Sequence, residues 1–192
     1  MALRTILTAP DPRLKKKSKP VETVDADVRQ LMDEMLETMY AAPGIGLAAP
    51  QVGVLKRVIV LEIDREETKI GPLFMANPEI IDASEDDAVY NEGCLSVPEH
   101  YADVTRPAEV TVRYLDRDGQ QQELKCDGLL STCVQHEIDH LDGILFIDHI
   151  SALKRNMILR KLLKARKEAA REEAEGKPAS KLKMATKEAA GA

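Results

Sequence analysis

Two histidines four residues apart, His136 and His140, are the side chains best placed to do chemistry in this 192-residue chain. On a helix, residues at this spacing lie on one face, so both imidazoles can bind a single metal ion. Glu137 follows the first histidine and would reach a water molecule on that ion, from which it can take a proton. The alternative is a helix with two solvated histidines and an accidental glutamate, because short motifs also arise by chance. The pattern favours a catalytic metal site.

A catalytic metal of this kind usually has three protein ligands and one open position, so a third ligand is required. One metalloprotease class supplies a histidine six residues after the motif, with a glycine between. Gly143 fits the glycine position, but Phe146 stands at the histidine position. Other enzymes use a downstream glutamate, and the first one here, Glu168, lies in a solvated Lys/Arg-rich stretch. His149 remains an alternative, although Gly143 is expected to end the helix before it.

The better third ligand lies upstream, at Cys94. This cysteine lies between Gly93 and Pro98, on a segment irregular enough to approach a metal closely. Its thiolate would complete a Cys-His-His set with one open position. A cysteine outside a disulfide is more often a small buried hydrophobic residue, so the ligand interpretation depends on the two histidines.

A third segment, residues 43–53, is uncharged and rich in glycine, alanine and proline. It has neither the Lys-Ser/Thr end of a phosphate-binding loop nor the G-x-G-x-x-G spacing, so nucleotide binding is disfavoured. Its small residues would instead let a ligand approach the backbone. Gln51 is the side chain of this segment that can donate a hydrogen bond.

Together these segments resemble the peptide deformylase family, whose members remove the formyl group from the N-terminal methionine of new bacterial polypeptides. The three motifs of the family stand here in the family's order as GIGLAAPQVG at 44–53, EGCLSVP at 92–98 and QHEIDHLDG at 135–143. The stretches at 6–11 and 115–119 are similar as well, and the resemblance covers about residues 4 to 165.

The resemblance implies a role for each residue of these motifs. Glu137 is implied as general base and then general acid. The side-chain amide of Gln51 and the backbone N–H of Leu95 are implied as donors to the oxyanion. The implied metal ligands are Cys94, His136 and His140.

The resemblance also implies a substrate site. The substrate backbone would dock on Ile45, Gly46 and Gly93, and the methionine pocket would be lined by Leu129, Thr132 and Cys133. The sequence departs from the family at His100-Tyr101, where some members carry an arginine near the substrate backbone. Arg106 would replace that arginine, or would pair with an acidic residue such as Glu92.

Mixed thiolate and imidazole ligation suits zinc, cobalt, nickel or ferrous iron. The resemblance implies Fe2+ in the cell, with Zn2+ often found in purified material. An iron–thiolate site is expected to be sensitive to oxygen.

Composition predicts a cytoplasmic enzyme with one catalytic domain. The chain is 44% hydrophobic, enough to bury a core at this length. Its three cysteines lack the spacing of a secreted disulfide scaffold. Cys126 and Cys133 are expected to be packing residues, with Cys133 alternatively lining the pocket. Residues 1–17 carry no apolar run of signal-peptide length, and no stretch is long enough to span a bilayer.

Hydrophobic periodicity predicts the elements that must position these residues. Apolar side chains recur at helical spacing from Val28 to Met39, with Asp25 as N-cap and Pro43 beyond the end. A buried helix is expected over about 129–141. Strands are expected at 57–63, 73–75, 79–82, 88–91, 110–115 and 121–126, the last two joined by a turn at 116–119. This order predicts an α+β fold in which antiparallel or mixed sheets wrap around the H-E-x-x-H helix, with further helices near the N- and C-termini.

The charges divide the chain into two parts. Residues 154–192 hold twelve Lys/Arg and five Asp/Glu, a net charge of +7, whereas the rest hold 15 and 28, a net charge of −13. We therefore expect a catalytic domain at 1–165 and a basic, Ala-rich tail at 166–192. Such a tail indicates contact with a polyanion, for which ribosomal RNA near the nascent chain is the candidate. The alternative is a solvated helix that frays after Gly176.

Two other functions remain open on the sequence. A zinc endopeptidase would share water activation by Glu137 but would cleave internal peptide bonds. A non-catalytic metal-binding module would need neither Glu137 nor an open coordination position.

Overall fold

The computed structural model describes residues 3–63 and 71–174 of the chain. The α-helices are α1 (Ala26–Ala41), α2 (Gly128–Leu141) and α3 (Ala152–Ala174), and short 3-10 helices are η1 (Pro12–Lys15), η2 (Ala49–Val52) and η3 (Phe146–Asp148). The strands are β1 (Gly46–Ala48), β2 (Val58–Leu61), β3 (Leu73–Ala83), β4 (Asp87–Cys94), β5 (Val97–Pro107), β6 (Glu109–Leu115) and β7 (Gln121–Asp127).

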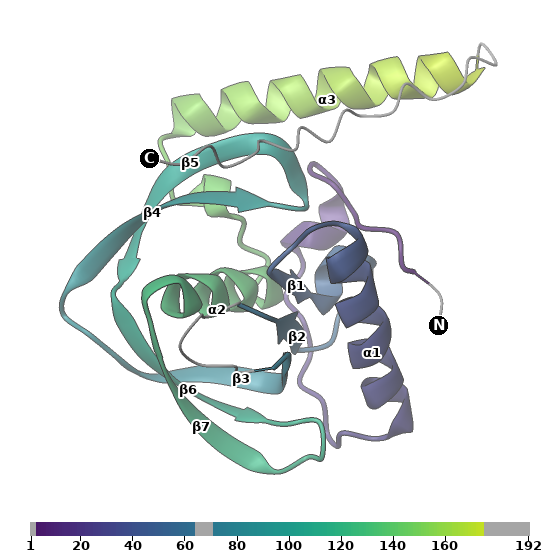
Figure 1. The fold of residues 1–192 in the computed structure, drawn as a ribbon. Coiled ribbons are helices and arrows are strands. Elements are labelled where there is room, and N and C mark those ends of the chain that lie inside the picture. The colour runs from purple at the N-terminus through teal and green to yellow at the C-terminus, as the bar shows by residue number, and fades with distance from the viewer. Residues whose placement is uncertain (1–2, 64–70, 175–192) are drawn as a thin grey trace, which may run out of the picture.

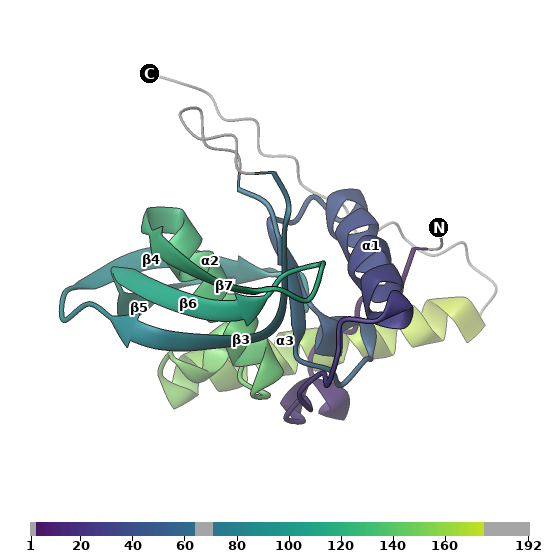
Figure 2. The ribbon, with the colours of Figure 1, turned by 90° about the horizontal axis from the view of Figure 1, so that it is seen from below.

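The strands form two antiparallel sheets. One has five strands in the order β1-β2-β3-β6-β7, and the other is the β4-β5 pair. Helix α2 contacts strands of both sheets and lies between them, as Figure 1 shows. Seen from below in Figure 2, strands β3 to β7 gather on one side of the molecule and α1 lies on the other. The predicted α+β class is therefore confirmed.

Strand β2 has a core on each of its faces. Successive side chains of a strand point to opposite faces. Val58 and Val60 accordingly join the apolar side chains of α1, whereas Ile59 and Leu61 join those of α2. All four side chains are fully buried, which explains why polar and apolar residues do not alternate along this strand. This arrangement fixes α1 and α2 on opposite faces of the β1-β2 edge.

Helix α1 begins and ends where the sequence predicted. The Asp25 side chain accepts a hydrogen bond from the backbone N–H of Val28 at 2.9 Å, which satisfies one of the unpaired donors of the first turn. The helix ends at Ala41, just before Pro43, and its predicted apolar face is buried. Its methionines are part of the core, as expected.

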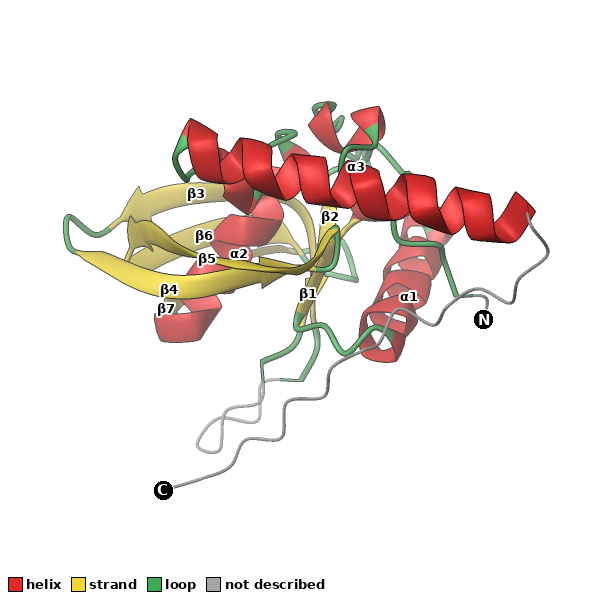
Figure 3. Ribbon diagram, turned by 90° about the horizontal axis from the view of Figure 1, so that it is seen from above, coloured by secondary structure: helices red, strands yellow, loops and turns green. Residues whose placement is uncertain are grey.

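A third apolar core joins the C-terminal helix to the two-stranded sheet. Leu162 of α3 packs with Val97 and Val104 of β5, and with Phe146 of η3. Figures 1 and 3 show α3 passing over the outside of β5 and continuing beyond it. Among the described residues, no helix combines the length and apolarity needed to cross a membrane.

The strand predictions were partly wrong. The expected segments at 73–75 and 79–82 form one strand, β3, whose pairing with β6 shifts between Ala76 and Glu79. Asn77 has a positive φ of 51° in that interval, and Pro78 cannot donate to the ladder, so the sequence there resembled a break. Strands β1 and β5 were not predicted; β5 ends in a proline and exposes alternate, mostly polar side chains. The basic residues 175–192 lie outside the described residues, and α3 continues through the expected boundary at 165.

Candidate metal centre

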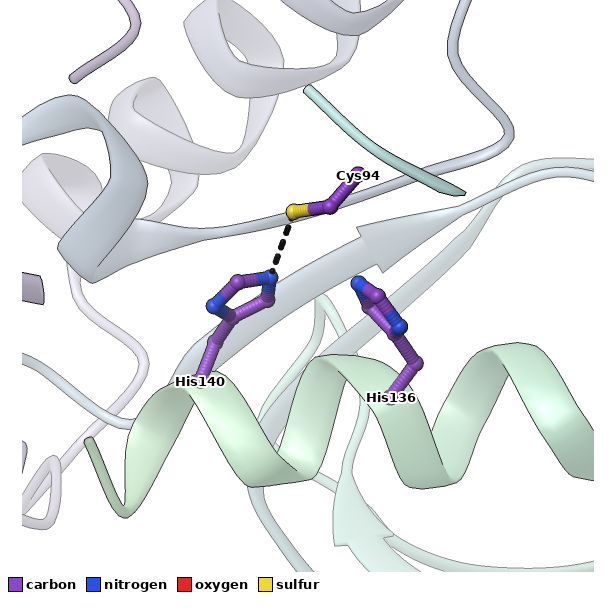
Figure 4. Close-up of side chains that lie close together, drawn as sticks. All are labelled: Cys94, His136 and His140. Carbon is purple, nitrogen blue, oxygen red and sulfur yellow. Dashed lines mark hydrogen bonds between the residues drawn. The ribbon is translucent and has the colours of Figure 1, made fainter. Parts of the chain in front are cut away.

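Cys94, His136 and His140 converge on one point. One candidate ligand atom from each lies within 4.8 Å of the others, and Cys94 Sγ is 3.2 Å from His140 Nε2. Figure 4 shows the two imidazoles rising from consecutive turns of α2, with the cysteine facing them from the opposite side. The structure thus brings Cys94 to two histidines that follow it by 42 and 46 positions in the sequence.

Two elements position these three side chains. Helix α2 places the histidines four residues apart on one face, with ring centroids 4.9 Å apart, and it is buried along most of its length. Cys94 ends β4, where the pairing with β5 shifts and the chain turns back at Val97. The irregular backbone predicted around this cysteine is therefore a tight connection between paired strands. The backbone N–H of Ser96 donates to Cys94 Sγ at 3.4 Å.

The donor set fits a divalent metal ion. Ligands of a tetrahedral metal with bonds of about 2.0 Å to nitrogen and 2.3 Å to sulfur stand roughly 3.3–3.6 Å apart. The observed Sγ–Nε2 separation of 3.2 Å and the limit of 4.8 Å across the set lie around this spacing. The Nδ1 atom of His136 is engaged by Glu92, which leaves its Nε2 atom to face the cluster. One sulfur and two imidazoles suit zinc, cobalt, nickel or ferrous iron.

A buried network of charged side chains holds the Nδ1 side of the His136 imidazole. Glu92 Oε2 lies 2.8 Å from His136 Nδ1, and a carboxylate only accepts, so the imidazole N–H is the donor. Arg106 donates to both oxygens of Glu92, at 2.6 and 3.1 Å, and to Asp139 Oδ2 at 2.8 Å. Burial disfavours the Glu92 carboxylate, but hydrogen bonds from His136 and Arg106 outweigh burial and hold its pKa below the ordinary value. Such a network fixes the tautomer and orientation of the imidazole.

Glu137 follows the ligand His136 in sequence, and its side chain is almost completely buried. Its side chain is 4% exposed, and burial raises its pKa from 4.5 to about 7. Its Oε2 atom has no hydrogen-bond partner among residues 3–63 and 71–174. A carboxylate with this pKa can both accept and return a proton near neutral pH.

Gln51 contacts Cys94, and Leu95 is the next residue in the chain after this cysteine. Gln51 Oε1 accepts from the backbone N–H of Ala48 at 2.8 Å, which turns the amide nitrogen toward Ser96 Oγ at 3.1 Å and Cys94 Sγ at 3.6 Å. An N–H donor therefore stands beside the thiol. Leu95 follows Cys94 directly in the β4–β5 connection.

The residues expected to bind substrate differ in their exposure to solvent. Thr132 and Cys133 are buried on α2, and burial raises the pKa of the Cys133 thiol well above its ordinary value. Leu129 and Ile45 are large apolar side chains that remain 43% and 46% exposed. Cys133 Sγ lies 3.8 Å from the backbone oxygen of Ile45, so the second turn of α2 lies against the start of β1.

Sequence reasoning missed the supporting roles of Glu92, Ser96 and Asp139. A signal for Glu92 was present, because residues 92 and 94 of one strand share a face, which points the carboxylate to the same side as the thiol. Arg106 pairs with Glu92, one of the two alternatives that the sequence left open. His149 is not part of the ligand cluster; its Nε2 atom lies 2.7 Å from Asp139 Oδ2.

Fold and site together define a metal-dependent hydrolase in which a half-buried sulfur donor and two buried nitrogen donors meet beside a buried glutamate. Comparison with known proteins gives the family. The profile of the family described as "Polypeptide deformylase" matches residues 3–156. The chain belongs to this family.

The relatives cover nearly the same length as this chain. A peptide deformylase of Rhizobium meliloti (strain 1021) is 55% identical over 167 residues, which span 87% of this chain and 96% of that protein. A peptide deformylase of Rhizorhabdus wittichii is 58% identical over 172 residues, spanning 87% and 97%.

Solved structures agree with the fold. The crystal structure of peptide deformylase from Ehrlichia chaffeensis superposes with a TM-score of 0.83 at 41% identity, covering 87% of this chain and 98% of that one. The same enzyme in complex with actinonin gives a TM-score of 0.82 at 43% identity, covering 86% and 98%.

Proposed function

We propose that this protein removes the formyl group from the N-terminal formylmethionine of nascent polypeptides and releases formate. The observation that carries the proposal is the Cys94-His136-His140 cluster beside the buried carboxylate of Glu137. Membership of the polypeptide deformylase family supports the reaction, and its relatives are named peptide deformylases. The reaction belongs in the cytoplasm, where nascent chains carry this group.

In this proposal Cys94, His136 and His140 hold a divalent metal ion. When bound, such an ion makes water more acidic and stabilises negative charge on a carbonyl oxygen. We propose that the ion in the cell is ferrous iron. Zinc, nickel or cobalt could replace it, because these ions also bind sulfur and nitrogen ligands.

The residues of the chain then account for the proton transfers. Glu137 accepts a proton from the attacking water, whose oxygen forms a bond to the formyl carbon. The Gln51 amide and the Leu95 backbone N–H donate hydrogen bonds to the oxygen on which negative charge develops; one such donor is worth about 3 kcal/mol. Glu137 returns its proton to the amine nitrogen as the C–N bond breaks, so that formate and a new N-terminus leave.

The same proposal assigns the substrate site. The substrate backbone docks along Ile45, Gly46 and Gly93, where β1 and the end of β4 flank the metal centre. The methionine side chain enters a pocket lined by Leu129, Thr132 and Cys133 on the first two turns of α2. In this view the two sheets serve to hold α2, the central helix with the H-E-x-x-H motif, against β4 and β1.

One assay tests the function against its alternatives. The protein is incubated with formyl-Met-Ala and with an unformylated peptide, and formate and new amines are measured. Formate from the first substrate alone is the expected result. Cleavage of internal bonds in the second would indicate an endopeptidase, and no reaction with either would indicate a metal-binding module.

A second test addresses the role of Glu137. Glu137→Ala removes the proposed acid and base but none of the metal ligands. The variant should therefore keep its metal content and lose roughly 10²–10⁴-fold in kcat, the usual contribution of a general acid–base group. A metal-loaded Glu137→Ala enzyme with wild-type turnover would refute the assignment.

We also propose that residues 1–165 form the catalytic domain and that the basic segment 166–192 contacts the ribosome. Leu162 is the last buried side chain of α3 among the described residues, and the side chains at 163–171 are exposed. Truncation after residue 165 should keep the Leu162 contact and the enzyme's activity on a short peptide. Ribosome binding should weaken as salt rises and disappear on truncation; unchanged binding by the truncated protein would rule out this role.

A further inference from the structure

Gly46 is a glycine for a reason other than backbone conformation. It is buried at the start of β1 and pairs with Leu61 of β2 in an ordinary antiparallel register. The described glycines with left-handed backbones are Gly53, Gly119, Gly128 and Gly143, and Gly46 is not among them. An alanine could therefore adopt the backbone of residue 46 without strain. The demand for glycine must come from the space around its Cα atom.

That space is filled by the carboxylate of Glu137. A Cβ atom on residue 46 would stand 2.4 Å from Glu137 Oε1 and 2.9 Å from Glu137 Cδ. It would also stand 3.0 Å from Cys133 Sγ, one helical turn before Glu137. Contacts under 3.0 Å are essentially never seen for real Cβ atoms, so an alanine would force the carboxylate to move.

Packing against Gly46 contributes to the placement of this carboxylate. Its Oε2 atom has no partner among the described residues, whereas His136 is held by Glu92 and Gln51 is held by Ala48. The bare Cα of Gly46 thus leaves the space that the Glu137 carboxylate occupies beside Cys133, and we call this space the seat of the Glu137 side chain. No hydrogen bond in this part of the chain would return Oε2 to its place once that seat is filled.

We propose that Gly46 is a positioning residue, whose missing side chain seats the Glu137 carboxylate for proton transfer. The proposal rests on the proposed function, since it assigns the proton transfers to Glu137. It adds a second role to the substrate docking expected of the Gly46 backbone, and the two roles differ in their kinetics. Docking uses the backbone groups of residue 46, which an alanine retains, and acts on KM; the seat acts on kcat.

The size of the effect follows from the overlap. Ordinary contact with a Cβ atom begins at 3.4 Å, so the 2.4 Å contact requires a shift of about 1 Å. A misplacement of about 1 Å in a reacting group can cost roughly 100-fold in rate. Gly46→Ala should therefore lower kcat on formyl-Met-Ala by about 100-fold and leave KM within a few-fold of wild type.

Three measurements on the metal-loaded enzyme decide the proposal. Steady-state kinetics compare Gly46→Ala with Gly71→Ala, a matched control, because no described atom lies within 4 Å of a Cβ built on Gly71. The visible spectrum of the Co2+-substituted protein should not change in Gly46→Ala, because the substitution leaves Cys94, His136 and His140 untouched. A loss confined to KM, a wild-type kcat or a changed cobalt spectrum would overturn the proposal.

A double-mutant cycle tests whether Gly46 acts through Glu137. Glu137→Asp withdraws the carboxylate by about 1.5 Å, the length of one C–C bond, and removes the overlap. The alanine at 46 should then cost far less in kcat than it does beside glutamate. An equal loss in both backgrounds would show that Gly46 acts by another route.

Folding and the parent function are controlled separately. Should Gly46→Ala fail to fold, the overlap explains the failure only if Gly46→Ala/Glu137→Asp folds; a double variant that also fails would refute the proposal. Wild-type protein that releases no formate from formyl-Met-Ala would reject the proposed function itself. Wild-type activity together with an unaffected kcat in Gly46→Ala would reject only the seat.

Discussion

Replacing Glu92 by glutamine should weaken metal binding without touching a metal ligand. The Glu92 carboxylate accepts from His136 Nδ1 at 2.8 Å and from Arg106 at 2.6 and 3.1 Å. A glutamine of the same shape offers one oxygen and one NH2 group, so either His136 or Arg106 must face an N–H instead of an acceptor. The imidazole then loses the partner that fixes its tautomer, or the guanidinium keeps its charge without its closest counter-ion.

The structure sets the magnitude of both effects. Loss of a partner that orients a metal-binding histidine typically costs about 10–100-fold in metal affinity. Breaking a buried ion pair costs about 3–5 kcal/mol, and the Arg106 and Glu92 side chains are only 6% and 4% exposed. Arg106 keeps Asp139 at 2.8 Å, which favours the lower end, about 3 kcal/mol. For a domain of this size that corresponds to a fall in Tm of roughly 6–12 °C.

The assay is a competition between the protein and a chromophoric chelator for Zn2+ or Co2+, with Tm recorded at one fixed free-metal concentration. Glu109→Gln is the matched control, because its pair with Lys125 is largely exposed and the same substitution there should change neither quantity appreciably. Wild-type metal affinity in Glu92→Gln would refute the reasoning that this network orients His136.

Three further outcomes are expected. Removal of the metal by a chelator should abolish formate release, and Fe2+, Co2+ or Zn2+ should restore it; deformylation that persists after elemental analysis finds no metal would contradict the proposed centre. Gln51→Ala should lower kcat by roughly 10²–10³-fold at unchanged metal content, as expected for loss of an oxyanion donor, and an unaffected kcat would remove Gln51 from the mechanism. Asp25→Ala should cost about 1 kcal/mol by removing the cap bond to Val28, which thermal unfolding would record as a fall in Tm of roughly 2–4 °C with unaltered kcat; an unchanged Tm would show that the cap contributes no stability.

Local patterns in the sequence predicted what depends on near neighbours. The spacing of His136 and His140 implied a shared face on a helix, and α2 has that face. Asp25 capped α1, and Gly143 follows the end of α2 in a left-handed conformation with a φ of 75°. Each of these features involves residues within about four positions of one another, where the backbone alone limits the geometry.

Strand boundaries were harder to predict, for a physical reason. A strand is stabilised by partners that are distant in sequence, so its own residues carry a weak signal. Strand β5 was missed because its polar outer face hides the alternation, and β3 appeared as two pieces because Asn77 and Pro78 interrupt its ladder with β6.

The sequence by itself determined the chemical groups: one thiol, two imidazoles, a carboxylate and a side-chain amide, on motifs that predicted the family. Only the tertiary structure decided which charges support them and what shapes their surroundings. Arg106 joins β5 to α2 by binding Glu92 and Asp139, and the bare Cα of Gly46 on β1 meets the carboxylate of Glu137 on α2. These contacts join residues 14 to 91 positions apart, which meet only when sheet and helix pack together.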